Sequence, residues 1–375
     1  MKIAVNTRLL VKNKLEGIGW FSYETLKRIT TQHPEHEFYF IFDRKHSEDF
    51  IFSDNITPIE LFPQARHPLL YYLWFEFSIP QLLKKLQPDL FLSPDGYTSL
   101  KSKFKSLVVF HDLNFEHYPE DIPLLERKYY KYFFPKYAKK ADRIATVSEY
   151  SKQDIVEQYK VSPDKIDVVF NGANENFVPL SKSEKIKTKK EFSNGASYFI
   201  YVGSLHPRKN LVNLLKAYDK FKTENSSSVK LLIVGEKMWN TSEIDEVFNK
   251  MKFKDEVIFT GRLNVDKLHK VLASALALTY VSYFEGFGIP IVEAFRCDVP
   301  VITSNVTSMP EISGDAALHV DPFSINSIAD ALKKIDKNEE LRNDLIEKGR
   351  RRRKDFTWQK SADNLWRAIE KTLMI

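Results

Sequence analysis

The chain has 375 residues, of which 43% are hydrophobic and 28% charged, and its formal net charge is +6. This composition excludes a wholly disordered chain, and the length suffices for about two domains. A single cysteine, Cys297, excludes an intramolecular disulfide and fits a reducing, cytoplasmic location. The apolar run at the N-terminus is short and predicts a first strand rather than a signal peptide. The sequence contains no run of about 18 apolar residues, so we expect no transmembrane helix.

The positive charge is local. Residues 1–180 carry 24 basic and 24 acidic side chains, whereas residues 181–375 carry 32 and 26. The segment Lys348–Lys354 alone holds six basic residues. A surplus confined to one run argues against nucleic acid as a partner. The run is either a solvated helix end or a peripheral contact with anionic lipid headgroups at the inner face of the plasma membrane.

Short β-rich segments alternate with helical patterns along the whole chain. The first series of predicted strands comprises Lys2–Thr7, Glu37–Phe42, Asp89–Ser93, Ser106–Phe110 and Arg143–Val147. The second series comprises Tyr198–Val202, Lys230–Val234, Val257–Thr260, Ala275–Val281 and Pro300–Thr303. Helical patterns between the strands include Trp20–Ile29, Leu211–Lys222, Val265–Ser274 and Ile325–Asp336. The alternation predicts an α/β protein with two doubly wound parallel domains.

A polar, lysine-rich segment without strand pattern, Ser181–Lys190, separates the two series. Such composition is typical of a linker that includes a charged helix. We therefore place an N-terminal domain at residues 1–175, a linker at 176–194 and a C-terminal domain at 195–356.

In the first half, Gly17 and Gly19 follow the first strand and precede a helix, a short glycine signal. His111 ends the strand Ser106–Phe110, where ligands of open α/β sheets bind, although a lone histidine can equally be structural. The segment Lys128–Lys136 mixes lysines with aromatic residues. It is either a membrane-interface helix or a helix packed on its own domain, and Pro135 is expected to interrupt a long amphipathic face.

In the second half, Gly203 and Ser204 follow a predicted strand, and Arg208 and Lys209 stand just before a helix. Two fixed cations there can hold a diphosphate. The alternative is a pair of solvated charges, but the helix dipole disfavours cations at a helix start.

The most informative segment is Phe284–Ala294, which follows a buried strand and opens a helix. Gly286 and Gly288 allow a ligand close to the backbone, and the helix start offers unpaired N–H groups to a phosphate. Glu285 and Glu293 bracket this turn and are expected to face one crevice. An anion cradle with carboxylates suggests a sugar nucleotide, whereas the alternative is an ordinary strand–turn–helix with glycines for packing.

These residues resemble the retaining glycosyltransferases of family 4, the glycosyl transferases group 1. The most specific match is Glu285-x7-Glu293, and the resemblance spans almost the entire chain. Its other parts, in order, are Gly17–Gly19, His111–Leu113, Val147–Ser151, Asn171–Gly172, Gly203–Asn210 and Thr303–Glu311. The segment His111–Pro119 is similar to the mannosyltransferase branch that builds O-antigen chains.

The resemblance implies the GT-B architecture, two Rossmann-like domains facing across a cleft, with a terminal helix at 357–375 crossing back to the first domain. The N-terminal domain would bind the acceptor and the C-terminal domain the sugar nucleotide. The implied donor-binding residues are Gly17, Gly19, Gly203, Ser204, Arg208, Lys209, Arg262, Leu263, Glu285, Gly286, Phe287, Gly288, Ile289 and Glu293.

The same resemblance implies individual roles. Arg208 and Lys209 would neutralise the diphosphate, Glu285 would contact the transferred sugar, and His111 would lie by the sugar's 6-position and the reacting centre. Glu293 would hold the ribose hydroxyls, and the backbone near Arg262 and Leu263 would take the base. No metal and no cofactor beyond the nucleotide-sugar co-substrate are expected, because cations and a helix N-terminus stabilise the leaving group.

The predicted function is transfer of a hexose to a saccharide or lipid-linked acceptor in surface polysaccharide or lipopolysaccharide biosynthesis. GDP-mannose is the leading donor, and UDP-linked glucose, galactose or N-acetylglucosamine are the alternatives. A nucleotide-sugar epimerase and a non-catalytic glycan-assembly subunit are rivals from other classes. Three residues depart from the family pattern: Asn6 stands where many relatives carry Asp, Trp20 where Arg is common, and Asp298 where Gly is frequent.

Overall fold

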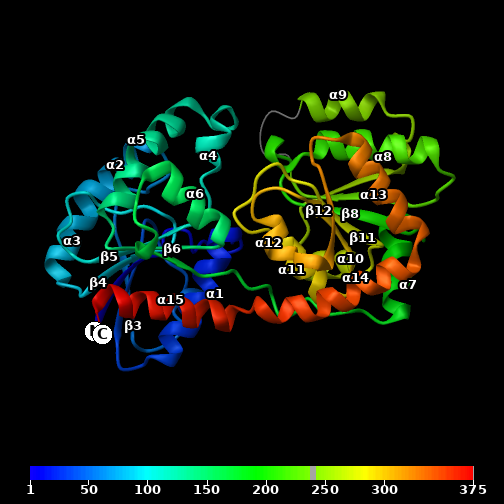
Figure 1. Cartoon of the computed structure of the whole chain (residues 1–375). Coiled ribbons are helices and arrows are strands. Elements are labelled where there is room, and N and C mark those ends of the chain that lie inside the picture. The colour runs from blue at the N-terminus through cyan, green and yellow to red at the C-terminus, as the bar shows by residue number, and fades with distance from the viewer. Residues whose placement is uncertain (237–241, 375) are drawn as a thin grey trace. The chain divides into compact units, whose positions relative to one another are not determined.

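The structure is a computed structural model that describes residues 1–236 and 242–374 (Figure 1). The chain forms two compact units: Met1–Gly172 together with Thr357–Ile375, and Ala173–Phe356. Each unit is built on its own parallel sheet. Within the described residues, no helix combines the length and apolar character needed to cross a membrane.

The N-terminal unit contains a seven-stranded parallel sheet in the order β3-β2-β1-β4-β5-β6-β7. Its strands are β1 (Lys2–Asn6), β2 (Glu37–Phe42), β3 (Ile56–Glu60), β4 (Leu90–Ser93), β5 (Ser106–Phe110), β6 (Arg143–Thr146) and β7 (Ile166–Val168). The five predicted strands are confirmed. The prediction missed β3 and β7, which are the two edge strands. Pro58 within β3 is tolerated because an edge strand has one unpaired side.

Helices cover both faces of this sheet. α1 (Gly17–Gln32) and α15 (Trp358–Leu373) pack on one face, against strand residues such as Ile3, Val5 and Phe40. The other face is covered by α2 (Pro68–Leu73), the π-helical turn η2 (Trp74–Ser78), α3 (Ile79–Leu86), α5 (Leu124–Lys140) and α6 (Glu149–Tyr159). A four-residue helix, α4 (Asn114–His117), follows β5. Alternate strand residues thus supply two apolar cores.

Helix α5 runs through Pro135 without a break, and the expectation that this proline interrupts a long amphipathic face stays a prediction. A helix proline lacks the N–H that would bond the carbonyl four residues earlier. That carbonyl belongs to Lys131, which is exposed, so water can satisfy it. The aromatic residues of α5 are partly in the core, where Tyr129 and Tyr137 are buried and their hydroxyls lie 2.7 Å apart.

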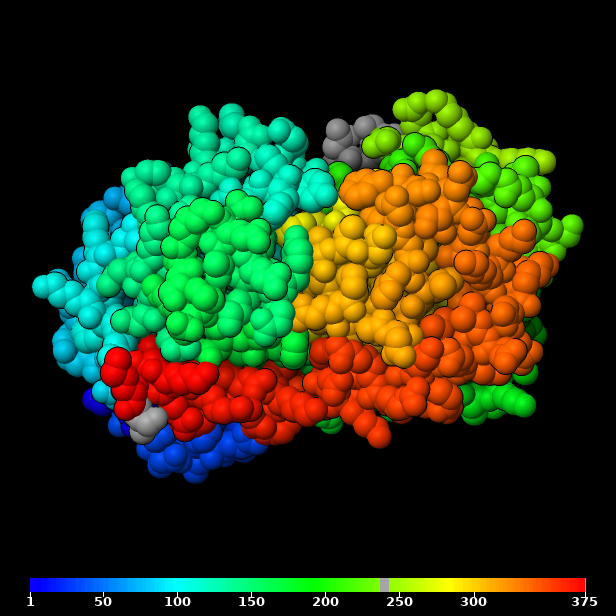
Figure 2. All heavy atoms as spheres, in the orientation of Figure 1, coloured from blue at the N-terminus to red at the C-terminus, as the bar shows by residue number. Residues whose placement is uncertain are grey.

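The C-terminal helix belongs to the first unit, as expected. Trp358, Leu365 and Ile369 of α15 are buried in the core beside α1. Ser361 Oγ donates to the Phe170 carbonyl at 2.5 Å. Figure 2 shows the opposite side of α15 in red at the surface. The final residue of the predicted helix, Ile375, lies outside the described residues.

The C-terminal unit contains a six-stranded parallel sheet in the order β10-β9-β8-β11-β12-β13. Its strands are β8 (Tyr198–Val202), β9 (Lys230–Val234), β10 (Val257–Gly261), β11 (Ala277–Tyr280), β12 (Val301–Ser304) and β13 (Ala317–Val320). Its helices are α7 (Lys182–Ser193), α8 (Leu211–Glu224), α9 (Ser242–Lys250), α10 (Val265–Ala273), α11 (Ile289–Arg296), α12 (Met309–Ser313), α13 (Ile325–Lys337) and α14 (Glu339–Arg352). The prediction missed only the edge strand β13 of this sheet.

The predicted fold class, two doubly wound parallel α/β domains, is confirmed. In each sheet the strand order reverses direction once, between β1 and β4 and between β8 and β11. Loops leaving the carboxyl ends of strands at such a reversal point diverge to opposite faces, which opens a crevice for a ligand. The sheet order therefore locates one candidate site in each unit.

The basic run Lys348–Lys354 is tied into its own unit. Arg350 and Arg353 both pair with the Asp298 carboxylate, at 2.6 and 3.1 Å. Arg352 Nε donates to the Ile312 carbonyl at 3.1 Å. Asp298 has φ 55°, a left-handed conformation that favours glycine, and its two arginine partners compensate for the side chain at this position.

Candidate functional site

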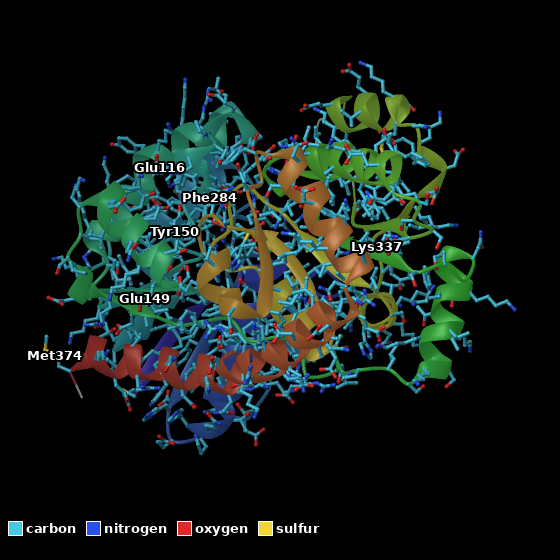
Figure 3. All side chains as sticks on the ribbon, turned by 45° about the vertical axis from the view of Figure 1, so that its right-hand side comes forward. Glu116, Glu149, Tyr150, Phe284, Lys337 and Met374 are labelled. Atoms are coloured by element: carbon cyan, nitrogen blue, oxygen red, sulfur yellow. The ribbon has the colours of Figure 1, made fainter. Side chains whose placement is uncertain are left out.

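The candidate site of the C-terminal unit lies at its sheet's reversal point. Arg208 and Lys209 follow β8 in a short 3-10 turn that leads into α8. Glu285 lies in the loop between β11 and α11, beside Phe284, which Figure 3 labels. Because β8 and β11 are paired neighbours, their loops meet although the sequence separates them by about 80 residues.

Glu285 makes two ion pairs at once. Its Oε2 lies 3.0 Å from Arg208 Nη1, and its Oε1 lies 2.6 Å from Lys209 Nζ. The carboxylate is 5% exposed. Burial alone raises the pKa of Glu285, but the charges of Lys209 and Arg208 and their hydrogen bonds outweigh it and lower the pKa to about 2. Glu285 is therefore ionised near neutral pH.

Neighbouring groups fix both cations. Lys209 Nζ donates to the Tyr280 hydroxyl at 2.9 Å, and Arg208 Nη1 donates to the Phe284 carbonyl at 3.0 Å. Asn210, which precedes α8 at φ 59°, donates from its side chain to the Val281 carbonyl at 2.8 Å. Tyr280 was not predicted as a site residue, although a tyrosine that ends the strand before the Glu285 loop is a visible signal in the sequence.

The loop that carries Glu285 is held by the segment after β12. Ser308 Oγ donates to the Glu285 carbonyl at 2.8 Å, and the Glu285 N–H donates to Thr307 Oγ1 at 3.3 Å. Thr307 has φ 58°. These contacts give a structural reason for the Thr303–Glu311 motif, which lines up the loop from the adjacent strand.

The start of α11 follows this loop. Gly288 has φ 96° as the N-cap residue, and a Cβ there would lie 3.1 Å from Ile291 Cδ1 and 3.4 Å from Tyr280 Cε1. Ile289 begins the helix and Pro290 is within its first turn. The first N–H groups of a helix have no partner within it, and its dipole is positive at this end, so an anion is favoured.

The remaining members of this loop have different surroundings. Phe287 is buried and packs edge-on against Phe356, with ring centroids 5.5 Å apart. Gly286 lies between Glu285 and Phe287 in the same loop. The phenylalanine ring anchors the loop, which leaves the backbone as the part able to meet a ligand.

Glu293 lies one turn into α11 in an environment unlike that of Glu285. Burial raises the pKa of Glu293 to about 7. The Glu285 carboxylate is paired with Arg208 and Lys209. Within the part of the chain that the structure describes, the Glu293 carboxylate has no ion pair or hydrogen bond. Such a carboxylate is prepared to accept hydrogen bonds from a ligand's hydroxyls.

Three glycines end three adjacent strands of this sheet: Gly203 after β8, Gly235 after β9 and Gly261 at the end of β10. A Cβ on Gly235 would lie 1.8 Å from the Gly203 carbonyl oxygen. The absence of side chains at these three positions keeps the edge open. Gly235 was not predicted, since an isolated glycine after a strand carries no distinctive spacing.

The other predicted donor residues of this unit lie along the same edge. Ser204 follows Gly203, and its carbonyl accepts from the Tyr201 hydroxyl at 2.8 Å. Arg262, which is exposed, and Leu263 follow β10, two strands away from β8. They lie at the same edge of the sheet as the Arg208–Glu285 cluster, but two strands away from it. This separation is compatible with a nucleobase that lies at some distance from its phosphates.

His111 lies in the N-terminal unit, directly after β5. Its Nε2 is 2.8 Å from the Pro94 carbonyl, which can only accept, so Nε2 carries the proton and Nδ1 presents its lone pair. Burial lowers the pKa of His111, and the Pro94 carbonyl and Asp112 oppose that shift only in part. The ring packs edge-on against Phe21 at 5.0 Å. The imidazole is thus neutral and held in one tautomer.

A buried polar network occupies the reversal point between β1 and β4 in this unit. Arg8 Nε lies 2.5 Å from Asp95 Oδ2, and both side chains are almost fully buried. Asn6 Nδ2 donates to Asp95 Oδ1 at 2.8 Å and to Ser93 Oγ at 2.9 Å. The sequence argument noted Asn6 only as a departure from the family pattern and missed Arg8 and Asp95. Their partnership spans 87 residues, so no local spacing reveals it.

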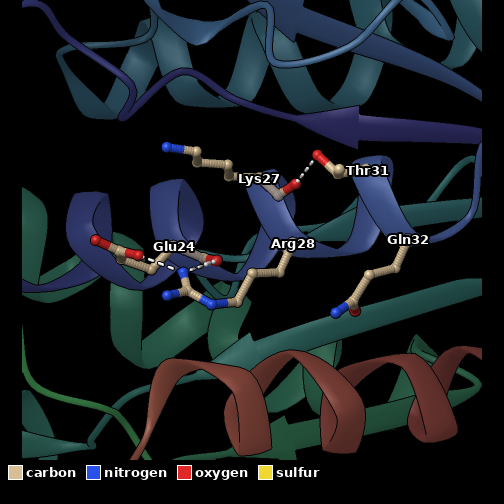
Figure 4. A pocket seen from close by; sticks show the side chains of 5 residues that line it. All are labelled: Glu24, Lys27, Arg28, Thr31 and Gln32. Atoms are coloured by element: carbon tan, nitrogen blue, oxygen red, sulfur yellow. Dashed lines mark hydrogen bonds and ion pairs between the residues drawn. The ribbon is translucent and has the colours of Figure 1, made fainter. Parts of the chain in front are cut away.

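Gly17 and Gly19 lie at the start of α1 in the N-terminal unit. A Cβ on Gly19 would approach the Leu9 carbonyl oxygen and Leu15 Cδ2 at 3.2 Å, whereas a Cβ on Gly17 would meet nothing within 4 Å. Gly19 therefore serves close packing. Further along α1, Figure 4 shows a shallow hollow in which Arg28 Nη1 bonds the Glu24 carbonyl at 3.1 Å. Its lining side chains bond to their own helix, and it carries no chemistry.

One group of the described residues has the composition of a metal site. His33, Glu35 and His36 place one ligand atom each within 4.8 Å of one another. They precede β2 and so lie at the amino edge of the sheet, opposite to the edge that holds His111. The group is therefore unrelated to the candidate sites.

The geometry of the C-terminal unit defines what its site can bind. Arg208, Lys209 and the N-terminus of α11 contribute positive charge, and Glu285 contributes one negative charge. The site is therefore net positive and can bind a phosphate or diphosphate. Glu293 adds an acceptor for hydroxyls. The combination fits a ligand that carries both groups, such as a sugar nucleotide.

Comparison with protein families gives two matches that together cover most of the chain. Residues 182–352 match the family model "Glycosyl transferases group 1", and residues 17–177 match "Glycosyltransferase Family 4". The chain is 26% identical over 366 residues to O-antigen chain mannosyltransferase B of Escherichia coli, covering 93% of this chain and 94% of that protein. It is 29% identical over 269 residues to O-antigen chain mannosyltransferase RfbU of Salmonella typhimurium, covering 72% and 71%.

Solved structures share the whole fold. Anabaena Alr3699/HepE in complex with UDP and glucose superposes with a TM-score of 0.77 at 14% identity, covering 99% of this chain and 100% of that one. WaaG, a glycosyltransferase involved in lipopolysaccharide biosynthesis, has a TM-score of 0.75 at 16% identity, covering 96% and 98%. The two parallel sheets and the returning C-terminal helix are those of the GT-B fold. The chain belongs to the retaining glycosyltransferases of family 4, the glycosyl transferases group 1.

Proposed function

We propose that this glycosyltransferase transfers mannose from GDP-mannose to a saccharide or lipid-linked acceptor during synthesis of a surface polysaccharide or lipopolysaccharide. The observation that carries a sugar-nucleotide donor is the cluster in which Arg208 and Lys209 converge on Glu285 at the start of α11. Mannose is supported by the relatives, because the names of both Escherichia coli mannosyltransferase B and Salmonella RfbU state that sugar.

In this proposal each charged group of the C-terminal unit has one task. Arg208 and Lys209 take the diphosphate, sharing their charge between it and Glu285. The backbone at Gly286–Gly288 meets the phosphate and sugar, and Glu285 accepts from a sugar hydroxyl. Glu293 accepts from the ribose hydroxyls, and backbone near Arg262 takes the base.

The chemistry follows from where charge develops. When the nucleoside diphosphate leaves, negative charge grows on its phosphate and positive charge on the sugar ring. Arg208, Lys209 and the N-terminus of α11 are already oriented before the reaction, so they stabilise the phosphate without reorganisation. Both Glu285 oxygens are engaged by cations, which makes that carboxylate a poor nucleophile. The proposal is therefore same-face attack in which the departing phosphate accepts the acceptor's proton.

His111 contributes from the N-terminal unit. Its Nδ1 lone pair can accept a hydrogen bond from a sugar hydroxyl, such as that at the 6-position, while Nε2 stays bonded to Pro94. As a neutral ring it places no positive charge beside an oxocarbenium-like sugar. The tautomer, rather than the charge, is what the surrounding structure supplies.

A UDP-linked hexose is the second candidate donor. It is supported by a structural neighbour, since Anabaena Alr3699/HepE has been solved with UDP-glucose. Glucose, galactose and N-acetylglucosamine donors differ from GDP-mannose in base and sugar but present the same diphosphate to Arg208 and Lys209. Donor selectivity therefore depends on the edge near Arg262 and on the sugar-side contacts.

A donor panel tests the proposal. GDP-mannose, GDP, UDP-glucose, UDP-galactose, UDP-N-acetylglucosamine and UDP are compared by thermal shift and by donor turnover with and without acceptor. A ligand that binds only the folded state raises the unfolding midpoint by mass action. We expect the largest shift with GDP-mannose. A larger shift with a UDP-sugar would select the second candidate, and epimerised donor without acceptor would exclude a transferase.

Single variants test the assigned roles. Lys209→Ala removes a charge that stabilises the departing phosphate, so we expect transfer to fall by about 10²–10³-fold. His111→Ala and Glu285→Ala should also lose transfer. Lys216→Ala, an exposed lysine of α8, is the matched control. If Lys209→Ala transferred as fast as the control variant, the diphosphate would not bind where we place it.

A further inference from the structure

Exposed apolar side chains gather on one side of the N-terminal unit. More than half of the strongly exposed large apolar residues of the described chain lie between Phe62 and Tyr132. Leu69, Leu73 and Phe77, spaced four residues apart along α2 and η2, are 61%, 38% and 43% exposed. Tyr132 on α5 is 58% exposed. This spacing places the first three on one side of a continuous helical segment.

Ring contacts connect Phe77 to Tyr132. The Phe77 ring contacts Tyr72 at 5.8 Å, Tyr72 contacts Phe133 at 5.9 Å, and Phe133 contacts Tyr132 at 4.9 Å. The ring contacts thus run from η2 to α5 without a gap. Both helices belong to the same cover of the sheet (Figure 1).

Lysines lie on the exposed rings. Lys101 Nζ is 3.7 Å from the centroid of Phe77, and Lys136 Nζ is 3.3 Å from that of Tyr132. We name the surface made by Leu69, Leu73, Phe77, Tyr132, Lys101 and Lys136 the α2–α5 face.

Acidic residues are scarce in the segments that form this face, although α5 also carries Glu126 in its first turn. Residues 61–88, 101–105 and 128–140 contain only one, Glu76, and that side chain is buried and accepts from the Leu100 N–H at 3.0 Å. The same ranges contain eleven basic residues: Arg66, Lys84, Lys85, Lys101, Lys103, Lys105, Lys128, Lys131, Lys136, Lys139 and Lys140. The N-terminal half has no net charge, yet its basic residues are concentrated here.

We propose that the α2–α5 face binds an anionic lipid surface. Apolar side chains between lysines, with more basic than acidic residues around them, match a membrane interface, where hydrocarbon lies beneath negatively charged headgroups. The Lys101 and Lys136 ammonium groups lie over the exposed rings of Phe77 and Tyr132, so positive charge and apolar surface share one face. A face of this kind would bring the acceptor-side unit to lipid-linked glycans, and it does not depend on the identity of the donor.

Vesicle binding tests this proposal. The full chain is floated with phosphatidylcholine vesicles, with and without phosphatidylglycerol. We expect binding only with the anionic lipid, and weaker binding at high salt. Lys101→Gln with Lys136→Gln should lower the partition coefficient by about fivefold for each charge lost, and Leu69→Ser with Leu73→Ser should lower it further.

Helix α7 supplies the matched control, because it is also lysine-rich and carries one strongly exposed apolar residue, Ile186. Ile186→Ser with Lys182→Gln and Lys187→Gln should bind vesicles like the wild type. As a reporter, Leu69→Trp should shift its emission to the blue on anionic vesicles, whereas Ile186→Trp should not. Circular dichroism and donor-induced thermal shift show that each variant is folded.

Two outcomes would overturn the proposal. Equal loss of binding in the α7 control would mean that net charge, not this face, holds the vesicle. A dimer in light scattering that Leu69→Ser with Leu73→Ser converts to monomers would mean that a second copy of the chain covers the face. Donor binding in solution should be normal in every variant, so failure of the lipid proposal is distinguishable from failure of the proposed transfer reaction.

Discussion

Two glutamates of one motif have opposite electrostatic surroundings. Glu285 is bound by Arg208 and Lys209, and its pKa falls to about 2. Glu293 is half-buried and has no cation paired with it among the described residues, and its pKa rises to about 7. The site therefore contains one permanently charged carboxylate and one whose charge responds to a ligand. Sequence spacing predicts both residues but not this difference, because the partners of Glu285 come from a loop about 80 residues away.

The Glu293 pKa predicts a proton linked to nucleotide binding. If the carboxylate accepts hydrogen bonds from ribose hydroxyls, the ionised form is favoured in the complex and a proton is released near pH 7. GDP affinity should then increase as the pH rises through about 7. Calorimetry in buffers of different ionisation enthalpy measures the released proton. The Glu293→Gln variant still shows any proton release that comes from the GDP phosphates. The proton release of Glu293 is therefore the difference between the wild type and this variant.

The same residue predicts a pH dependence of the unliganded protein. The folded-state pKa of about 7 lies above the ordinary value of 4.5, so the folded protein binds the proton more tightly than the unfolded chain. The contribution of Glu293 to the free energy of unfolding is therefore most favourable below pH 4.5 and is lost as the pH rises to about 7. Glu293→Gln should flatten that part of the profile. An unchanged slope in the variant would mean that Glu293 is solvated and would remove the basis for the proton-release prediction.

At the scale of residues, what the sequence predicts depends on chain distance. Arg208, Lys209 and Glu285 were identified because each stands in a local pattern of strand, glycine and helix. Tyr280 and the Arg8–Asp95 pair were missed, since they act through contacts between adjacent strands that are remote in sequence.

At the scale of elements, the predicted strands are those with neighbours on both sides, together with the edge strand β10. Buried parallel strands form continuous apolar runs, which composition alone reveals. The three missed strands, β3, β7 and β13, all lie at sheet edges and are short or partly exposed. Edge strands are defined by pairing with one neighbour, and that neighbour is not visible in a local pattern.

The glycine row at the ends of β8, β9 and β10 gives a prediction for one element. A Cβ on Gly235 would lie 1.8 Å from the Gly203 carbonyl oxygen, so Gly235→Ala must push β8 and β9 apart at their ends. We expect a loss of about 1–3 kcal/mol in the free energy of unfolding, as for other overpacked sites, together with weaker GDP binding. Urea denaturation measures the free energy of unfolding, and calorimetry on the folded variant measures GDP binding.

The control for this glycine is Gly17→Ala. A Cβ there meets nothing within 4 Å, and the residue begins α1, where alanine is a better helix former than glycine. The stability of this variant should be unchanged or slightly higher. If Gly235→Ala behaved in the same way, the close approach of the two strand ends would not constrain this edge.

At the scale of the whole molecule, net charge is a poor guide to function. The surplus of +6 equals the charge of Lys348–Lys354, yet Arg350, Arg352 and Arg353 of that run bond Asp298 or backbone carbonyls of their own unit. The N-terminal half is neutral in sum, yet it carries the α2–α5 face, where basic residues lie apart from acidic ones. The arrangement of charge in the fold, rather than its total, decides which surface can meet an anionic partner.

The last helix links the end of the chain to the first unit, which predicts that stability and donor binding respond to different substitutions. Leu365 of α15 is fully buried beside α1. Leu365→Ala should cost about 2–5 kcal/mol through the lost contacts and the cavity, and hydrogen exchange should accelerate in α1 and β1 of that unit. The midpoint shift that GDP gives to residues 173–356 should persist, because Arg208, Lys209 and Glu285 belong to a separate core. A loss of GDP affinity as large as that of Lys209→Ala would contradict this division and would mean that donor binding requires an intact first unit.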